Sequence, residues 1–214
     1  MLNLNEITLI SSNCVDGWIT EKLPGYRGWT NPFVWAMFDK YSYEILMTQY
    51  NNINFDNIVF FDKQENVLEY INKSNNSEDL LKKVERFLNA KNINEQYWGI
   101  IDDNIVFFHM HMHFDKMQTA AENKNCKNGL ECLYNIYRKR LNIMKTKTPV
   151  FLYKSFKDID FVESQYDIIY YNEKNNINIA DILYTDDNGY GDHRVFESNN
   201  FINTMISFFK TKYK

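Results

Sequence analysis

The stretch ITLISSNCVDGWITEKLPGYRGWTNPFVWAMF, residues 7–38, decides how this chain is expected to fold. It begins with a short apolar run, residues 7–10, that predicts a buried strand, and it soon continues into a segment, residues 15–23, that predicts a helix. Open α/β sheets place their chemistry where a strand ends and the next helix begins. Cys14, in the connecting turn, is therefore the first candidate for a nucleophile.

The rest of the chain alternates between strand and helix patterns. Apolar runs predict strands at residues 57–61, 104–112, 149–154, 167–172 and 179–184. Helical spacing predicts helices at residues 33–50, 64–72, 77–90, 128–145 and 198–212. Pro32 suits the first turn of the helix at 33–50. No linker rich in Pro, Gly or Ser divides the chain. We therefore expect one α/β domain over residues 1–214: a three-layer sandwich with a largely parallel or mixed central sheet and helices on both faces.

Composition restricts the partners. The chain has a net charge of -4, 44% hydrophobic residues and 16% aromatic residues, so it can bury a substantial core. It lacks the basic surplus that nucleic-acid binding needs, and no apolar run approaches the roughly 20 residues of a membrane span. The first residues show no secretory pattern. We expect a protein without nucleic-acid partners and without a membrane span.

The three cysteines form no paired framework, which favours a reducing cytoplasm. The spacing of Cys126 and Cys132 is not typical of metal ligands, and we interpret both as incidental. Neither a Walker loop nor a Gly-x-Gly-x-x-Gly motif is present, which argues against ATPase and dinucleotide chemistry. No cofactor is expected.

Two interpretations of Cys14 remain open. The amides of the helix that follows could lower its pKa and hold an oxyanion near Gly17, with Ser12 and Asn13 as further donors. Alternatively, Cys14 is a small buried residue at the end of a strand. The position and the residue types do not decide between a nucleophile and a packing residue.

The sequence His-Met-His-Met-His at residues 109–113 places three imidazoles on one face of the predicted strand. His109 or His111 could serve as the general base for Cys14. Two of the three histidines could instead hold a zinc-type ion with a remote ligand, or the row could be solvated. We assign no metal.

A second candidate base is His193, in a polar loop rich in glycine before the last predicted helix. Asp192 is its neighbour, and the acidic pair at 186–187 could orient it instead. The alternative is an ordinary charged turn.

Arg138 and Arg140 lie on the helix predicted at 128–145, and guanidinium groups bind phosphate or carboxylate in a bidentate manner. They could therefore anchor a phosphorylated or nucleotide-linked sugar, or they could form a solvated face that pairs with Glu131. Asp102 and Asp103 weakly suggest the metal motif of a nucleotide-sugar transferase.

These motifs resemble a bacterial exopolysaccharide-biosynthesis family of otherwise unknown function. The resemblance is carried by Ser-x-Asn-Cys-x-x-Gly-x-Ile at 11–19, by Asn-Pro-Phe-Val at 31–34, and by the order of the segments at 99–111, 138–142 and 150–152. It covers most of residues 7–155. We include Asn31 of the second motif among the expected binding residues.

Two looser resemblances concern the thiol. A papain-like cysteine peptidase family carries Pro-Phe-Asp-Trp, where this chain has Pro-Phe-Val-Trp at 32–35 and so lacks the acidic residue. The Gly-Ser-Cys-Phe-Ala family, allied to SGNH esterases, is similar around Cys14, but its usual Asp-x-x-His is absent because Tyr190 stands three residues before His193. What these resemblances imply is Cys14 as nucleophile, with a histidine from 109–113 or His193 as base.

The function expected from these features is a cytoplasmic enzyme of capsular or exopolysaccharide biosynthesis. It would be a thiol-dependent acyl-type transferase or hydrolase that acts on a sugar or a nucleotide- or phosphate-linked sugar donor. One alternative is a non-catalytic carbohydrate- or protein-binding component of the same pathway, in which tryptophan and tyrosine rings stack on sugars. Another is a metal-dependent glycosyltransferase-like enzyme.

Overall fold

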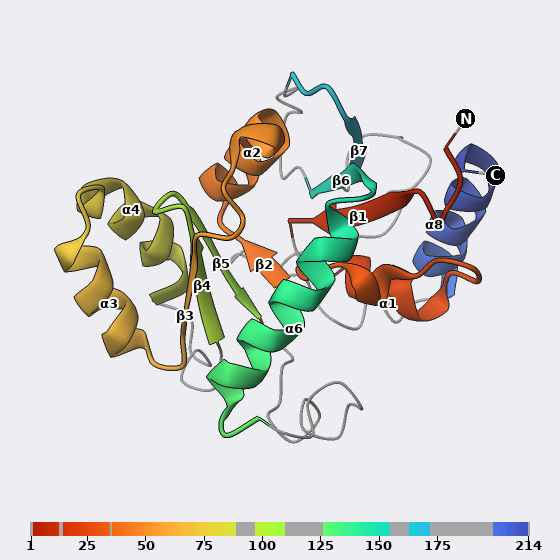
Figure 1. Ribbon diagram of the computed structural model, residues 1–214. Coiled ribbons are helices and arrows are strands. Elements are labelled where there is room, and N and C mark those ends of the chain that lie inside the picture. The colour runs from red at the N-terminus through yellow and green to blue at the C-terminus, as the bar shows by residue number, and fades with distance from the viewer. Residues whose placement is uncertain are drawn as a thin grey trace.

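The computed structural model describes residues 2–12, 15–34, 36–88, 97–109, 126–154, 163–171 and 199–213 (Figure 1). Its elements are β1 (Ile7–Ser11), α1 (Val15–Lys22), η1 (Gly28–Thr30), β2 (Ala36–Phe38), α2 (Lys40–Gln49), η2 (Tyr50–Asn52), β3 (Ile58–Phe61), α3 (Gln64–Lys73), α4 (Ser77–Leu88), β4 (Tyr97–Ile101), β5 (Ile105–His109), α6 (Gly129–Met144), β6 (Thr148–Lys154), β7 (Asp167–Tyr171) and α8 (Asn199–Lys212).

The described strands form two sheets. β1, β6 and β7 make a parallel sheet in the order β1-β6-β7, and the other four make an antiparallel sheet in the order β2-β5-β4-β3. The predicted α/β class is confirmed. Instead of one central sheet, the described residues show two sheets that meet at Ser12, whose carbonyl accepts a hydrogen bond from Phe38 N–H at 3.1 Å.

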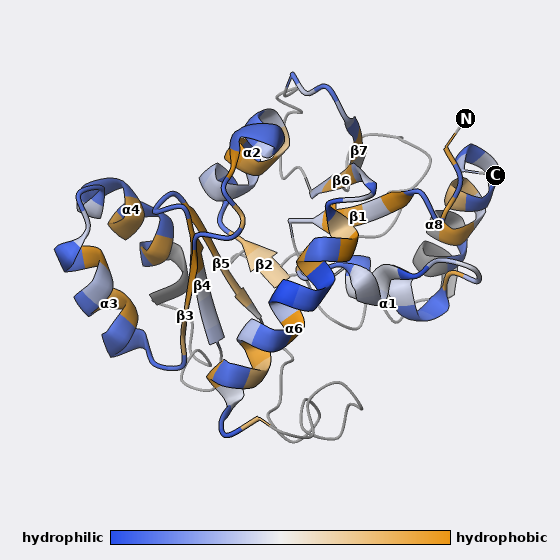
Figure 2. Cartoon of the chain, viewed as in Figure 1, coloured by the Kyte–Doolittle hydropathy of each residue, from blue (hydrophilic) through white to orange (hydrophobic). Residues whose placement is uncertain are grey.

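Both sheets contribute to a central hydrophobic cluster. Ile10 of β1 and Phe107 of β5 belong to it, together with residues of α2 and α6. The neighbouring residues on the same strands point to the opposite face of each sheet: Leu9 of β1 packs with α1 and α8, and Phe108 of β5 packs with α3 and α4. Each sheet thus has one face on the shared centre and the other covered by helices, and α6 lies between the sheets (Figure 1). The helices α3, α4 and α6 carry blue and orange residues in alternation, as amphipathic helices do (Figure 2).

The helix predicted at 33–50 is wrong in its first part. Residues 36–38 form β2, which pairs with β5, and Pro32 lies in a turn. The helix begins at Lys40, because the carboxylate of Asp39 caps it by accepting a hydrogen bond from Ser42 N–H at 2.7 Å. A short strand before a good cap resembles a continuous helical pattern in the sequence.

The other predicted elements are found with small shifts where the structure describes them, and β4 appears where no strand was predicted. The predicted strand at 104–112 is seen as Ile105–His109. The strand predicted at 179–184 lies outside the described residues.

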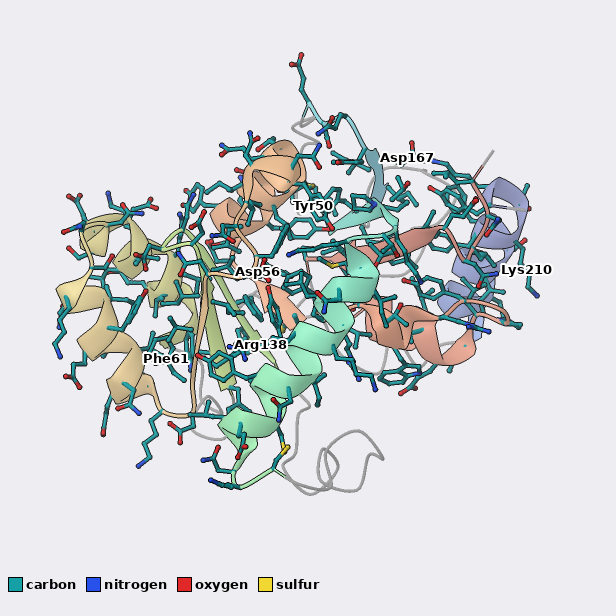
Figure 3. The ribbon with its side chains drawn as sticks, viewed as in Figure 1. Tyr50, Asp56, Phe61, Arg138, Asp167 and Lys210 are labelled. Carbon is teal, nitrogen blue, oxygen red and sulfur yellow. A yellow bond between two sulfur atoms is a disulfide. The ribbon has the colours of Figure 1, made fainter. Side chains whose placement is uncertain are left out.

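The last helix is fastened to the edge of the parallel sheet through Asp167 (labelled in Figure 3). Its carboxylate lies 3.0 Å from Lys212 Nζ and accepts a hydrogen bond from Tyr213 Oη at 2.9 Å. Burial alone would raise the pKa of Asp167, but the hydrogen bonds from Lys212 and Tyr213 and the charge of Lys212 lower it on balance.

We expect Asp167→Asn to reduce the dependence of stability on pH in the acid range. A carboxyl group whose pKa is depressed by folding stabilises the protein above its unfolded pKa, and this contribution is lost as the pH falls through the folded pKa. The pair is half exposed, so the effect between neutral and acid pH is less than about 1 kcal/mol. Urea unfolding of both proteins at several pH values below neutrality measures it. Equal acid slopes for the two proteins would contradict the assignment.

Candidate functional site

The turn that carries Cys14 joins β1 to α1. β1 ends at Ser11 and α1 begins at Val15, so the predicted strand, turn and helix are present in that order. Cys14 and Asn13 lie outside the described residues. The described residues on each side place the turn at the carboxyl end of a parallel strand, next to the first turn of a helix.

Ser12 anchors the start of this turn to both sheets. Its backbone N–H donates to the carbonyl of Leu152 on β6, and its carbonyl accepts from Phe38 on β2, each at 3.1 Å. Close by, Tyr43 Oη donates to the carbonyls of Ile10 at 2.6 Å and Leu152 at 3.0 Å. The entry to the turn is therefore held by hydrogen bonds from three other elements.

A buried carboxylate stands at the beginning of α1. Asp16 is 1% exposed, and Gly17 beside it is buried. The pKa of Tyr26 is raised, chiefly by burial and to a smaller extent by the negative charge of Asp16. No sequence pattern assigned Asp16 a role, although it is an acidic residue in the first turn of a predicted helix. An ionised Asp16 would disfavour a thiolate at Cys14 and so oppose the effect of the helix amides.

Asn31 has a structural role that the sequence did not indicate. Its side chain is 1% exposed, its Nδ2 donates to the carbonyl of Leu9, and its Oδ1 accepts from Phe33 N–H at 2.9 Å. Leu9 N–H in turn donates to Tyr26 Oη at 2.7 Å. Within the described parallel sheet β1 is an edge strand, so these two side chains occupy backbone groups that would otherwise be open to another strand.

The two arginines that were expected to bind phosphate lie on different sides of α6. Arg138 and Arg140 are two residues apart on α6 and therefore point to different sides of the helix. Arg138 is exposed and lies over the ring of Tyr134, 5.9 Å from its centroid, and Tyr134 Oη accepts a hydrogen bond from Phe60 N–H of β3. Figure 3 shows Arg138 on this part of α6. Arg140 is half-buried, with an interior Nε.

The strand that leads into the histidine row ends near the cysteine turn. His109 is the last residue of β5 and pairs in register with Ala36 of β2, two residues before Phe38, which bonds to Ser12. Two strand spacings of about 4.8 Å and two residues of about 3.3 Å separate the backbone of Ser12 from that of His109 by roughly 12 Å. His111, His193 and Asp192 lie outside the described residues.

Asp102 and Asp103 are the central residues of the tight turn between β4 and β5, which Asn104 N–H closes by donating to the carbonyl of Ile101 at 3.0 Å. Both have positive φ, 54° and 50°, as the central residues of a type I′ turn do. Asp102 accepts a hydrogen bond from Asn57 Nδ2 at 3.1 Å, and Asp103 accepts one from Tyr70 Oη. These contacts explain the acidic pair without a metal. In the described part of the chain, no group of three or more His, Cys, Asp or Glu residues is placed to hold a metal ion.

The interpretation of Cys126 and Cys132 as incidental is wrong, because a disulfide joins them at the start of α6. The Cα atoms are 5.2 Å apart. Asn128 caps the helix between them by accepting a hydrogen bond from Glu131 N–H at 2.9 Å. This turn folds the chain back and brings the two cysteines together, which spacing alone did not reveal. Cys14 is left as the one cysteine outside the bridge.

No helix in the described ranges is long and apolar enough to cross a bilayer. A scan against protein-family models finds no family that matches the chain, and a search of curated proteins finds no match either. The resemblance to an exopolysaccharide-biosynthesis family therefore stays a prediction that rests on the residues quoted for it.

Proposed function

We propose that this chain is a cysteine-dependent enzyme that transfers or hydrolyses an acyl group on a saccharide in bacterial surface-polysaccharide assembly. The observation that supports the proposal best is the link from Ser12 through β2 to the end of β5. This link brings the start of the histidine row to the neighbourhood of the turn that carries Cys14. A thiol beside a base is the arrangement that thiol catalysis needs.

In the proposed reaction, Cys14 Sγ bonds to the carbonyl carbon of an acylated sugar while a histidine accepts the thiol proton. The histidine returns this proton to the departing sugar oxygen as the carbon–oxygen bond breaks, which leaves a thioester. Water resolves the thioester in a hydrolase, and an acceptor hydroxyl resolves it in a transferase. Backbone amides at the start of α1, near Gly17, would stabilise the oxyanion.

The proposal includes the cytoplasmic location and the sugar substrate expected from the sequence. The bridge between Cys126 and Cys132 weakens the argument for a reducing compartment, because disulfides persist mainly outside such compartments. The thiol chemistry does not depend on the location, since Cys14 takes no part in this bridge.

The pH dependence of alkylation tests the proposal. With the disulfide intact and no reductant present, iodoacetamide has Cys14 as its one target thiol. We expect an apparent pKa clearly below the ordinary value of about 8.5. Peptide mass spectrometry follows the rate from pH 5 to pH 10, and Cys14→Ser is the blank. Slow labelling with a pKa at or above the ordinary value would make Cys14 a packing residue and overturn the proposal.

Two sets of variants identify the groups that act on the thiol. Of His109→Gln, His111→Gln and His193→Gln, the variant that raises the pKa of Cys14 names the base. Asp16→Asn should lower that pKa further, because it removes a buried carboxylate from the start of α1. No effect from any histidine variant would contradict the histidine–thiol pair.

A second candidate function, carbohydrate binding without catalysis, is favoured by Trp29, whose side chain is 47% exposed. Large rings are normally covered, and an exposed indole suits the face of a sugar. Cys14→Ala separates the two functions: it abolishes turnover in an enzyme and leaves the effect of a binding protein intact.

A further inference from the structure

Two cations, Arg27 and Lys147, lie beside η1 and have no acidic partner in the part of the chain that the structure describes. Lys147 is half-buried, and its Nζ donates to Thr30 Oγ1 at 3.1 Å. Its pKa is lowered, first by burial and then by the positive charge of Arg27. Among the described residues, neither Lys147 nor Arg27 forms an ion pair, whereas Lys145 nearby binds Asp56 at 2.7 Å.

The geometry of η1 places Lys147 on the side of the turn that Arg27 and Thr30 share. In a 3-10 helix, residues three apart lie above one another, so Thr30 stands over Arg27, to whose carbonyl its hydroxyl donates at 2.7 Å. Because the Thr30 hydroxyl donates its hydrogen bond to the backbone carbonyl of Arg27, its oxygen can only accept a hydrogen bond from Lys147. Lys147 thus has a hydroxyl partner that offers no negative charge. Trp29, the exposed ring of the same turn, precedes Thr30 by one residue and therefore points about a third of a turn away from the side of Arg27 and Thr30, so its indole borders this side.

The turn is built rigidly. A Cβ at Gly28 would lie 1.9 Å from Thr20 Oγ1 and 2.4 Å from the ring of Tyr26, so the backbone of η1 is packed directly onto α1. Tyr26 and Asn31, on either side of the turn, both bond to Leu9 of β1. Residues 27–30 are therefore held in place before any ligand arrives, which reduces the entropy lost on binding.

We propose that Arg27 and Lys147 bind the anionic group of a carbohydrate and that Trp29 packs against its sugar ring. Holding the half-buried ammonium group of Lys147 near the exposed, like-charged Arg27 costs free energy, and a bound phosphate or carboxylate recovers it. The arginine supplies a planar fork of donors, the lysine a point charge, and the indole a flat apolar face. A uronate and a sugar phosphate share this chemistry.

The anion site is separate from the turn that carries Cys14. Lys147 precedes β6, whose first residue, Thr148, pairs with Ile7 at the beginning of β1. Ser11, at the opposite end of β1, leads to the turn that carries Cys14, and five residue steps of about 3.3 Å place it roughly 16 Å along the strand from the level of Lys147, with η1 held between them at Leu9. The anion site therefore does not need Cys14, and its test does not depend on the proposed enzyme activity.

Titration calorimetry at low salt tests the site with four probes: a galacturonate hexamer, glucose 1-phosphate, maltohexaose and inorganic phosphate. We expect one or both anionic sugars to bind, maltohexaose not to bind, and phosphate to bind more weakly than glucose 1-phosphate. Binding of the uronate alone would identify an acidic polysaccharide as the ligand that carries the anionic group. Binding of glucose 1-phosphate alone would identify a phosphorylated sugar.

Matched variants assign the binding to these residues. Arg27→Met and Lys147→Met should each weaken binding about tenfold, as the loss of one charge-assisted hydrogen bond predicts, and Trp29→Ala should weaken it for the sugars only. Lys145→Met is the control and should leave binding unchanged, because Lys145 is neutralised by Asp56.

Three results would overturn the proposal. The first is that neither anionic sugar binds. The second is that both bind equally to wild type and to the Arg27 and Lys147 variants. The third is that Lys147→Met lowers the thermal midpoint without any change in binding. Lys147 would then be a cation that only stabilises the carboxyl end of α6 through the helix dipole. We expect the thermal midpoint of this variant to stay level or rise, since a like-charge contact is removed.

Discussion

Replacing Gly99 by alanine is expected to lower the free energy of unfolding by about 2 kcal/mol, within the range that overpacking a core produces. Gly99 lies on β4, directly opposite Phe107 of β5. A Cβ at Gly99 would approach the Phe107 ring to 2.4 Å. The ring cannot turn away easily, because it is fully buried and packs against Phe33, Phe38 and Phe60. Urea unfolding measures the loss.

A double-mutant cycle shows whether the phenylalanine ring is the cause. Phe107→Leu alone removes ring contacts and is destabilising, but in the Gly99→Ala protein the smaller leucine makes room for the new methyl group. We therefore expect the double variant to be more stable than the sum of the two single effects predicts, by about 1 kcal/mol. Strictly additive effects would contradict the contact.

The same glycine explains why β4 was not predicted. The apolar run at 97–101 is short and has Gly99 at its centre, and a glycine inside a strand pattern weakens the strand signal. The structure uses the missing side chain as space for a ring from the next strand. Strands with short continuous apolar runs, such as β1 and β6, were found from the sequence because such runs are typical of strands that are buried on both faces.

The sequence predicted the position of the candidate site better than the roles of its residues. The order of strand, turn and helix around Cys14 follows from local patterns that a strand and a helix impose on the chain. The roles of Asn31 and Cys132 depend on partners that the fold brings near: the open edge of β1 in one case and Cys126 in the other. Local patterns contain no information about such partners.

The edge of β1 connects the fold to both proposed sites. Its middle is covered by Tyr26 and Asn31, which hold η1 and with it Arg27 and Trp29. Its carboxyl end continues into Ser12, which bonds to β2 and leads to the cysteine turn. An edge strand must be protected from pairing with other chains, and here the segments that protect it are also the ones that carry the candidate binding groups.

Replacing Asp79 by alanine is expected to lower the free energy of unfolding by about 2–3 kcal/mol, which is below the full cost of breaking a buried ion pair because Asp79 is half exposed. Its partner Lys83 is 2% exposed and donates to Asp79 Oδ2 and to the backbone and side-chain oxygens of Asn104 at 2.8 and 2.7 Å. The variant leaves a buried ammonium group with neutral acceptors only. Asn104 belongs to the turn between β4 and β5, so this lysine also fastens α4 to the antiparallel sheet.

Glu78 provides the matched control for this prediction, because it stands one residue earlier in the first turn of the same helix and pairs with Lys82 at 3.0 Å. Both residues of that pair are well exposed, with side-chain exposures of 64% and 87%. Glu78→Ala should therefore change stability by less than about 0.5 kcal/mol, the usual value for an exposed helical pair. Both variants lose one acidic residue from the amino end of α4, so the effect on the helix dipole cancels in the comparison. Equal losses of unfolding free energy in the two variants would show that burial of Lys83 contributes nothing to the effect. A clearly larger loss for Asp79→Ala would show that the variant is destabilised because the buried ammonium group has lost its carboxylate.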